Sequence, residues 1–238
     1  MHAGAPDHRS AMALGATLVV VLGAWNIVVV PRFPARPGAY VAANGAATAV
    51  LLAAARAAGL AWADLGLDRR RLAAGAREGG VCAAVVASGY AVALAVPGAR
   101  PLLADARVAG LDGRGIAGQV LVRVPLGTVL WEEVAFRGAL PAVLARLVSP
   151  RRAAGASAAL FGIWHVRPTL DALAVNGLAT RPRERVAAVL LACLSTAAAG
   201  LLFAQLRRHS GSLLAPALLH LAANSLGILA AAAAHRLR

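Results

Sequence analysis

Residues 11–30 read AMALGATLVVVLGAWNIVVV and contain no charged side chain. A helix rises about 1.5 Å per residue, so this run covers about 30 Å, the thickness of the hydrocarbon core of a bilayer. The run is longer than the apolar core of a secretory signal, and no convincing small-x-small cleavage site follows it. We therefore predict that these residues form a retained membrane-spanning helix.

The composition of the whole chain agrees with a membrane location. Of the 238 residues, 60% are hydrophobic and only 14% are charged, whereas about a quarter of the residues in soluble domains are charged. The mean hydropathy is +0.70. Such a chain is too apolar to be disordered and has too little polar surface for a soluble globular domain. The composition thus favours an integral membrane protein.

The positive charge of the chain fits membrane loops better than a nucleic-acid interface. The net charge is +14, and all 24 basic residues are arginine. They stand in short clusters between apolar runs, as loop arginines of membrane proteins do, so no nucleic-acid partner is expected. Cys82 and Cys193 lie inside apolar runs without metal or redox spacing, which makes them small buried hydrophobes.

Further apolar runs predict an all-α fold, a polytopic transmembrane helical bundle with seven or eight spans in the cell membrane. The eighth span arises if residues 153–178 divide into two helices. Residues 64–78 between two of the runs are arginine-rich, and either an interfacial amphipathic helix or a plain loop fits them. After residues 11–30, the runs cover residues 40–60, 80–96, 116–148, 153–178, 186–206 and 213–234.

The run 116–148 is exceptional because it contains ionisable residues, which are costly at membrane depth and suggest function. Glu133 and Arg137 are four residues apart on one helix face, so they are expected to form an ion pair. Glu132 points about 100° away and has no obvious local partner. The alternative is that all three form a structural ion network between helices.

Two other apolar runs carry polar side chains of catalytic type. His165 ends the segment FGIWH, and His220 and Asn224 are four residues apart on one helix face. Each set alone also fits structural hydrogen bonding between helices. Together with Glu132 they predict an intramembrane polar cavity, in which Glu132 with a histidine activates water and His220 with Asn224 stabilises an oxyanion. No Gly-x-Ser-x-Gly elbow and no His-Glu-x-x-His motif is present.

The three motifs, Glu-Glu-x-x-x-Arg, Phe-x-x-x-His and His-x-x-x-Asn, resemble in order those of the CPBP family of CAAX-processing and bacteriocin-processing (Abi) intramembrane proteases, the type II CAAX prenyl endopeptidase group. The resemblance covers residues 116–229, so residues 116–238 are expected to be the catalytic helices of one integrated membrane domain and residues 1–115 its N-terminal transmembrane helices with interfacial loops. It implies that the catalytic residues are Glu132, His165, His220 and Asn224, supported by Glu133, Arg137 and Phe161.

The resemblance further implies an endopeptidase that acts on a peptide or membrane-protein substrate in the lipid bilayer, such as a prenylated CAAX-like protein, a bacteriocin or a signalling peptide. The family, which has bacterial members, is often labelled as metalloproteases, but a metal-free glutamate mechanism fits its motifs. The resemblance therefore implies that no cofactor is required, and it leaves open whether a divalent metal takes part. The alternatives are a non-catalytic membrane regulator or immunity protein and a small transporter that uses Glu132 for proton coupling. A transporter of this kind is expected to consist of two pseudo-symmetric halves, and the sequence shows no such repeat.

Overall fold

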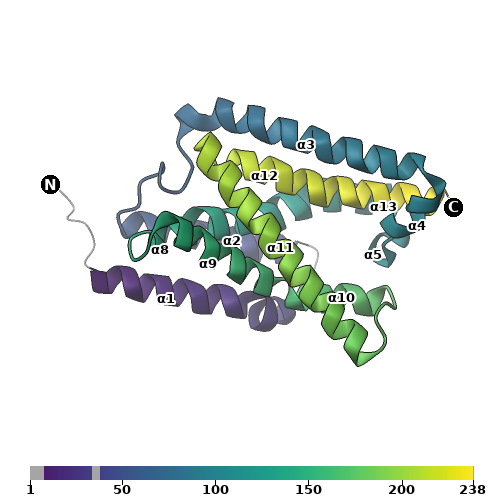
Figure 1. Ribbon diagram of the computed structural model, residues 1–238, viewed down its shortest axis with the longest axis horizontal. Coiled ribbons are helices and arrows are strands. Elements are labelled where there is room, and N and C mark those ends of the chain that lie inside the picture. The colour runs from purple at the N-terminus through teal and green to yellow at the C-terminus, as the bar shows by residue number, and fades with distance from the viewer. Residues whose placement is uncertain (1–7, 34–37, 238) are drawn as a thin grey trace.

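The computed structural model describes residues 8–33 and 38–237, which form helices and turns without a β-strand. Figure 1 shows the long helices packed as a bundle, with α11 crossing in front of the others. Turns with π-helical or 3-10 geometry extend several of the α-helices and are labelled η. In chain order the elements are α1 (His8–Ala24), η1 (Trp25–Val29), η2 (Val30–Arg32), α2 (Ala39–Ala57), η3 (Arg69–Arg71), α3 (Leu72–Ala95), η4 (Pro97–Ala99), α4 (Arg100–Leu103), α5 (Ala106–Ala109), α6 (Gly113–Gly118), η5 (Gln119–Val129), α7 (Leu130–Glu133), η6 (Val134–Ala139), α8 (Leu140–Leu144), α9 (Pro150–Trp164), α10 (Val166–Val175), α11 (Pro182–Ser210), α12 (Leu214–Leu221), η7 (Ala222–Leu226) and α13 (Gly227–Arg236).

Five helical segments of the described chain are long and apolar enough to cross a membrane, which confirms the all-α polytopic class. Their outward faces carry large apolar side chains such as Val85 and Leu194, as lipid-facing surfaces do. The run from α6 to α8, residues 113–144, is also long enough but carries five ionisable side chains, so the count of seven or eight spans stays a prediction. The five spans are Ala11–Arg32, Ala39–Ala57, Arg69–Ala95, Pro182–Ser210 and Leu214–Arg236.

The helix bounds decide between two alternatives of the sequence analysis in one place and differ from its expectation in another. The run 153–178 does divide, because α9 ends at Trp164 and α10 begins at Val166. The arginine-rich segment 64–78 is neither a separate interfacial helix nor a loop throughout. Its second half already belongs to the third span: Asp68 accepts a hydrogen bond from the backbone N–H of Arg70 and starts η3, and α3 continues from there.

Small residues allow the helices that carry the site to approach closely. A Cβ atom at Gly79 of α3 would lie 2.7 Å from the carbonyl oxygen of Ala215 in α12, and one at Gly162 of α9 would lie 2.6 Å from that of Cys193 in α11. Figure 1 shows α3 lying alongside α12 and α13. Because lipid offers no hydrophobic force between helices, such close backbone contact is a main source of packing energy.

The buried core lies around the charged helix and not at the centre of the apolar spans. α1 packs against α8 and α9, and α2 packs against η5, so the N-terminal helices wrap the helices of the C-terminal half. Aromatic rings from three segments form this core: those of Phe136 and Trp164 are 5.1 Å apart, and those of Trp25 and Trp131 are 5.0 Å apart. The same core surrounds the ionisable groups.

Candidate active site

The helix of residues 113–144 carries the first group of predicted site residues in its buried middle. Glu132, Glu133 and Arg137 are only 5%, 1% and 3% exposed. π-helical turns lie on both sides of the two glutamates, at η5 around Pro125 and at η6, which contains Arg137 and ends just before Pro141. A proline lacks the N–H donor and its ring clashes with the preceding turn, and a widened turn relieves both problems. Such π-helical turns are frequent at functional sites.

Glu133 is held by two charged or polar partners, which confirms the predicted pairing with Arg137. Its Oε1 accepts a hydrogen bond from Arg137 at 3.1 Å and one from Nδ1 of His220 at 2.8 Å. The guanidinium of Arg137 also lies 3.9 Å from the ring centroid of Phe161 and 4.7 Å from that of Phe203. A carboxylate and two aromatic faces therefore replace the water that this buried cation has lost.

Only one of the two carboxylate oxygens of Glu132 accepts a hydrogen bond. Its Oε1 accepts a hydrogen bond from the indole N–H of Trp164 at 3.1 Å. Its Oε2 is buried and has no hydrogen-bond partner among the described residues, and it lies 3.8 Å from Nε2 of His220. A buried carboxylate oxygen without a donor is costly. One oxygen of Glu132 is thus left without a hydrogen bond, as is Oε2 of Glu133, but Glu132 is the one of the two that lines the cavity described below.

His165 stands at the break between α9 and α10, and the break fixes its tautomer. Its Nδ1 lies 2.8 Å from the carbonyl oxygen of Phe161, which can only accept a hydrogen bond. Nδ1 therefore carries the proton, and Nε2 of the neutral ring is left with a free lone pair. The ring of Phe161 packs edge-on against that of His165 at a centroid distance of 4.6 Å. Phe161 thus supports both His165 and Arg137.

His220 in α12 and Asn224 in η7 complete the predicted set. Because Nδ1 of His220 donates to Glu133, its Nε2 faces Glu132 and can donate a hydrogen bond only when the ring is protonated. In that state the charges of Glu132, Glu133, Arg137 and His220 sum to zero. Tyr90 of α3 fixes η7 by donating a hydrogen bond to the carbonyl oxygen of Ala223 at 3.0 Å.

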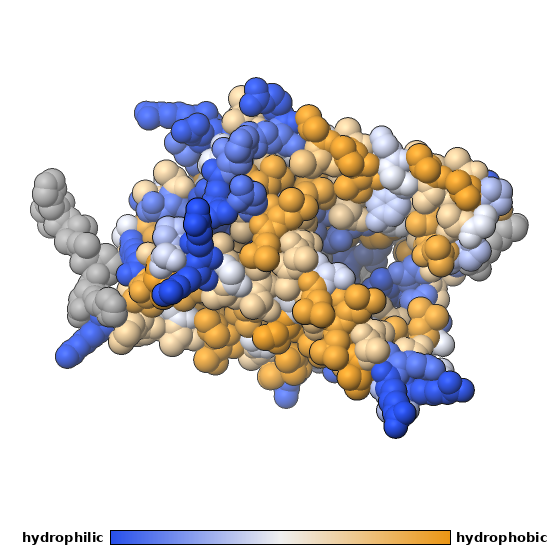
Figure 2. All heavy atoms as spheres, in the orientation of Figure 1, coloured by the Kyte–Doolittle hydropathy of each residue, from blue (hydrophilic) through white to orange (hydrophobic). Residues whose placement is uncertain are grey.

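One cavity of about 640 Å³ joins the four predicted catalytic residues. Glu132, His165, His220 and Asn224 all line it, whereas Glu133, Arg137 and Phe161 lie behind its wall. Its lining includes residues of α5, α10 and α13. Figure 2 shows a hydrophilic recess in the same part of the molecule, bordered by apolar side chains. The prediction of an intramembrane polar cavity is thus matched by the geometry of the described chain.

Further polar groups of the cavity were not singled out from the sequence. Tyr40 donates to or accepts from Thr128 at 3.3 Å, and the guanidinium of Arg123 lies 4.4 Å from the Tyr40 ring. Asp105 accepts hydrogen bonds from Arg107 in the loop next to the cavity, and these bonds lower the pKa of Asp105 to about 2. This carboxylate is therefore ionised at any pH at which the protein is expected to work.

Trp164 is the functional side chain that the sequence reasoning missed. It stands in the quoted segment FGIWH but received no role there. The signal was available, because a buried indole N–H usually finds a hydrogen-bond partner. Asn26 of η1 supports it by donating to the carbonyl oxygen of Trp164 at 3.2 Å. The first span is thereby tied to the site.

The described residues contain no group of three His, Cys, Asp or Glu side chains placed to hold one metal ion. Nδ1 of His220 is engaged by Glu133 and Nδ1 of His165 by a backbone carbonyl. The donor set of the described residues therefore does not fit a three-ligand site of the kind that catalytic zinc uses.

The comparisons with known proteins agree with the motif resemblance. Residues 117–226 match the model of a family described as type II CAAX prenyl endopeptidase Rce1-like. No curated protein and no solved structure gives a significant match. The resemblance to this family is thereby confirmed, and it supports CAAX-type endopeptidase function within a membrane in general.

Proposed function

Because residues 117–226 match the Rce1-like family, we propose that this protein is an intramembrane endopeptidase of the cell membrane that hydrolyses a peptide bond with an activated water. The observation that carries the proposal is the placement of Glu132, His165, His220 and Asn224 around one cavity. The substrate is a peptide or a membrane protein, for which prenylated CAAX-like proteins, bacteriocins and signalling peptides are the candidates.

In the proposed mechanism Glu132 is the general base. Its Oε2, which has no donor in the described chain, accepts a proton from a water molecule in the cavity. The free lone pair at Nε2 of His165 orients the same water by accepting its second proton in a hydrogen bond. The hydroxide that forms attacks the carbonyl carbon of the scissile bond, and the carbonyl oxygen becomes an oxyanion.

The other two residues are assigned to that oxyanion. Asn224 donates with its amide, and His220 donates with Nε2 while Glu133 stabilises the protonated ring. When the tetrahedral intermediate collapses, the C–N bond breaks and Glu132 returns its proton to the leaving amine. Water is thus split between the new carboxyl group and the new amine, so the atoms balance without a cofactor.

The decisive experiment compares cells that carry the wild-type protein with cells that carry Glu132→Gln. This change keeps the size of the side chain and its hydrogen bond with Trp164 through the amide oxygen, so the protein level is expected to stay nearly constant. Cleavage is expected to fall below detection, because an amide cannot accept the proton of water. Mass spectrometry of new peptide termini in the membrane fraction measures both the loss and the substrate.

The same experiment separates an enzyme from a regulator. If Glu132→Gln keeps the wild-type set of peptide termini and the wild-type phenotype, the glutamate is not the base. If the phenotype persists while no terminus ever depends on the protein, its role is binding a partner in the membrane.

A further inference from the structure

The loop of residues 58–68 and the turn η3 connect two membrane spans at one end of the molecule. α2 ends at Ala57, and the next span begins at Arg69. The chain must therefore leave and re-enter the hydrocarbon layer here, which places the loop at the level of the lipid headgroups. Tryptophan and arginine are common at this level because each combines an apolar part with a polar end.

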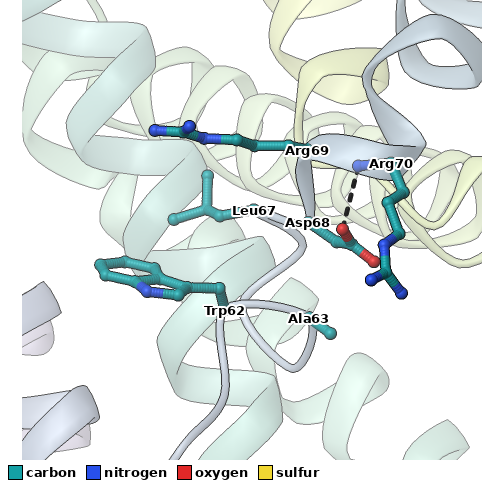
Figure 3. Close-up of a pocket in the computed structure, with 6 residues that line it drawn as sticks. All are labelled: Trp62, Ala63, Leu67, Asp68, Arg69 and Arg70. Atoms are coloured by element: carbon teal, nitrogen blue, oxygen red, sulfur yellow. Dashed lines mark hydrogen bonds between the residues drawn. The ribbon is translucent and has the colours of Figure 1, made fainter.

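A pocket of about 680 Å³ opens on this loop, away from the catalytic cavity. Trp62, Ala63, Leu67, Asp68, Arg69 and Arg70 line it. Figure 3 shows the side chain of Arg69 on the same side as Leu67 and the Trp62 ring, while that of Arg70 lies near Asp68. Trp62 is 47% exposed although it is a large apolar ring. The pocket thus combines an apolar wall with a cationic rim.

The charges of the pocket are unbalanced. Neither the Arg69 nor the Arg70 side chain has a hydrogen-bond or ion-pair partner in the described part of the chain. Asp68 uses Oδ1 for the backbone N–H of Arg70, at 2.9 Å. A third guanidinium, that of Arg56, lies 5.1 Å from the centroid of the Trp62 ring. Three cations thus stand beside one carboxylate, which favours an anionic ligand.

Hydrogen bonds from other parts of the chain hold the loop that forms the pocket. The carbonyl oxygen of Gly66 accepts a hydrogen bond from the backbone N–H of Leu213 at 2.8 Å, and Leu65 is fully buried. Arg207 of α11 donates to the carbonyl oxygens of Ala63 and Asp64 at 3.1 and 2.9 Å. A ligand therefore meets a preformed pocket and pays little for ordering it.

From this combination we propose that the pocket binds the phosphate-bearing headgroup of an anionic membrane lipid. Arg69 contacts the phosphate oxygens, Arg70 adds positive charge at the rim, and Trp62 and Leu67 pack against the glycerol backbone and the first methylenes of the acyl chains. Guanidinium groups suit phosphate because they donate several hydrogen bonds in a fixed plane. The position between two spans favours a lipid over a soluble phosphate, since the apolar wall would otherwise face water.

The fluorescence of Trp62 provides a direct test. The protein is placed in bilayers of phosphatidylcholine with an equal small fraction of either brominated phosphatidylglycerol or brominated phosphatidylcholine. Bromine quenches tryptophan only at close range, and the difference between wild type and Trp62→Phe isolates the signal of Trp62. We expect the anionic lipid to quench Trp62 at a concentration about tenfold lower than the zwitterionic lipid does, since each interfacial arginine contributes to anionic-lipid binding.

Two pairs of substitutions make the test specific. Arg69→Gln with Arg70→Gln is expected to remove the preference for the anionic lipid. Arg151→Gln with Arg152→Gln changes the net charge equally at exposed positions of α9. These positions lie at the same end of the molecule, since Arg146 in the preceding loop donates a hydrogen bond to the carbonyl oxygen of Ala58. The second pair is expected to keep the preference.

The proposal is overturned if both lipids quench Trp62 equally, or if both arginine pairs reduce quenching to the same extent. It is also overturned if glycerol 3-phosphate in the aqueous phase abolishes the preference at millimolar concentration, because the pocket would then bind the free phosphate. The readout requires no peptide cleavage, so its outcome is independent of the proposed protease activity.

Discussion

Two adjacent glutamates on one helix have opposite surroundings, and the contrast divides the site into a closed wall and an open face. The wall consists of Glu133, Arg137 and Nδ1 of His220, whose charges are joined by hydrogen bonds of 2.8 and 3.1 Å. The open face consists of Glu132, His165 and Asn224, which border the cavity. The wall pairs opposite charges with each other, although Oε2 of Glu133 and one terminal nitrogen of Arg137 have no hydrogen-bond partner among the described residues. The face instead borders the cavity and contains a carboxylate that is paired with no cation by hydrogen bonds.

This contrast explains why a membrane helix can hold two neighbouring acids. A buried charge is tolerated when a partner replaces its hydration, and Glu133 with Arg137 meets that condition within one turn of helix. The remaining carboxylate, to which the proposed mechanism assigns the chemistry, accepts a hydrogen bond from an indole donor. The division also makes different predictions for the two regions: changes to the face alter rate, and changes to the wall alter stability.

After the loss of cleavage expected for Glu132→Gln, the largest effect in this comparison is expected at Asn224. Asn224→Ala removes an oxyanion donor from the open face, and loss of such a donor costs about 10²- to 10³-fold in kcat, or about 3–4 kcal/mol. KM is expected to change little, because the contact forms only in the transition state. Measurement of kcat, KM and melting temperature on one detergent preparation tests this.

A matched control for Asn224 is Asn44→Ala. Asn44 of α2 is buried and makes two structural hydrogen bonds, to the Trp25 indole at 2.9 Å and to the Gly127 carbonyl at 2.6 Å. Its loss is expected to lower the melting temperature while kcat per folded molecule stays normal. A normal kcat for Asn224→Ala would end the oxyanion assignment and leave the residue with a structural role like that of Asn44.

The next effect concerns the wall. Glu133→Gln leaves Arg137 buried without a countercharge, and breaking a buried pair in this way is expected to cost about 3 kcal/mol of stability. The melting temperature in detergent should therefore fall, and activity should fall with the folded fraction. Glu184→Gln is the comparison, because its ion pair with Arg181 is exposed at 3.3 Å and is worth less than about 1 kcal/mol.

A double substitution sharpens the same prediction. Glu133→Gln with Arg137→Gln removes the unpaired charge, so part of the lost stability is expected to return. If Glu133→Gln instead melts like the wild type and loses only kcat, then Glu133 takes part in the chemistry and the division between wall and face is wrong.

Much of this division could be read from the sequence, because it depends on local geometry. A spacing of four residues predicted the pairing of Glu133 with Arg137, and the order of the motifs predicted which residues belong to the site. The contacts of Glu132 could not be read in this way. They depend on how α9 and α12 pack against the charged helix, which brings Trp164 and His220 to Glu132, and spacing along one helix does not give contacts between helices. The start of the third span was misplaced for a local reason, because Asp68 caps η3 and the helix begins inside the arginine-rich segment.

The smallest expected effect concerns Trp164, which links the open face to the core. Trp164→Phe keeps an aromatic ring beside Phe136 but removes the N–H that Glu132 accepts at 3.1 Å. A hydrogen bond to a charged group contributes about 1.5 kcal/mol, so we expect kcat to fall about tenfold while KM stays unchanged. The loss arises because the carboxylate is no longer held in the one orientation that points Oε2 at the cavity.

The neighbouring tryptophan supplies the control for this prediction. Trp131 is buried in the same aromatic cluster, but its indole N–H has no hydrogen-bond partner among the described residues. Trp131→Phe therefore removes a donor that bonds nothing, and its kcat is expected to stay close to that of the wild type. If both substitutions lower kcat equally, the effect of Trp164 comes from packing alone. A tenfold loss confined to Trp164→Phe would instead show that the core helps to position the base.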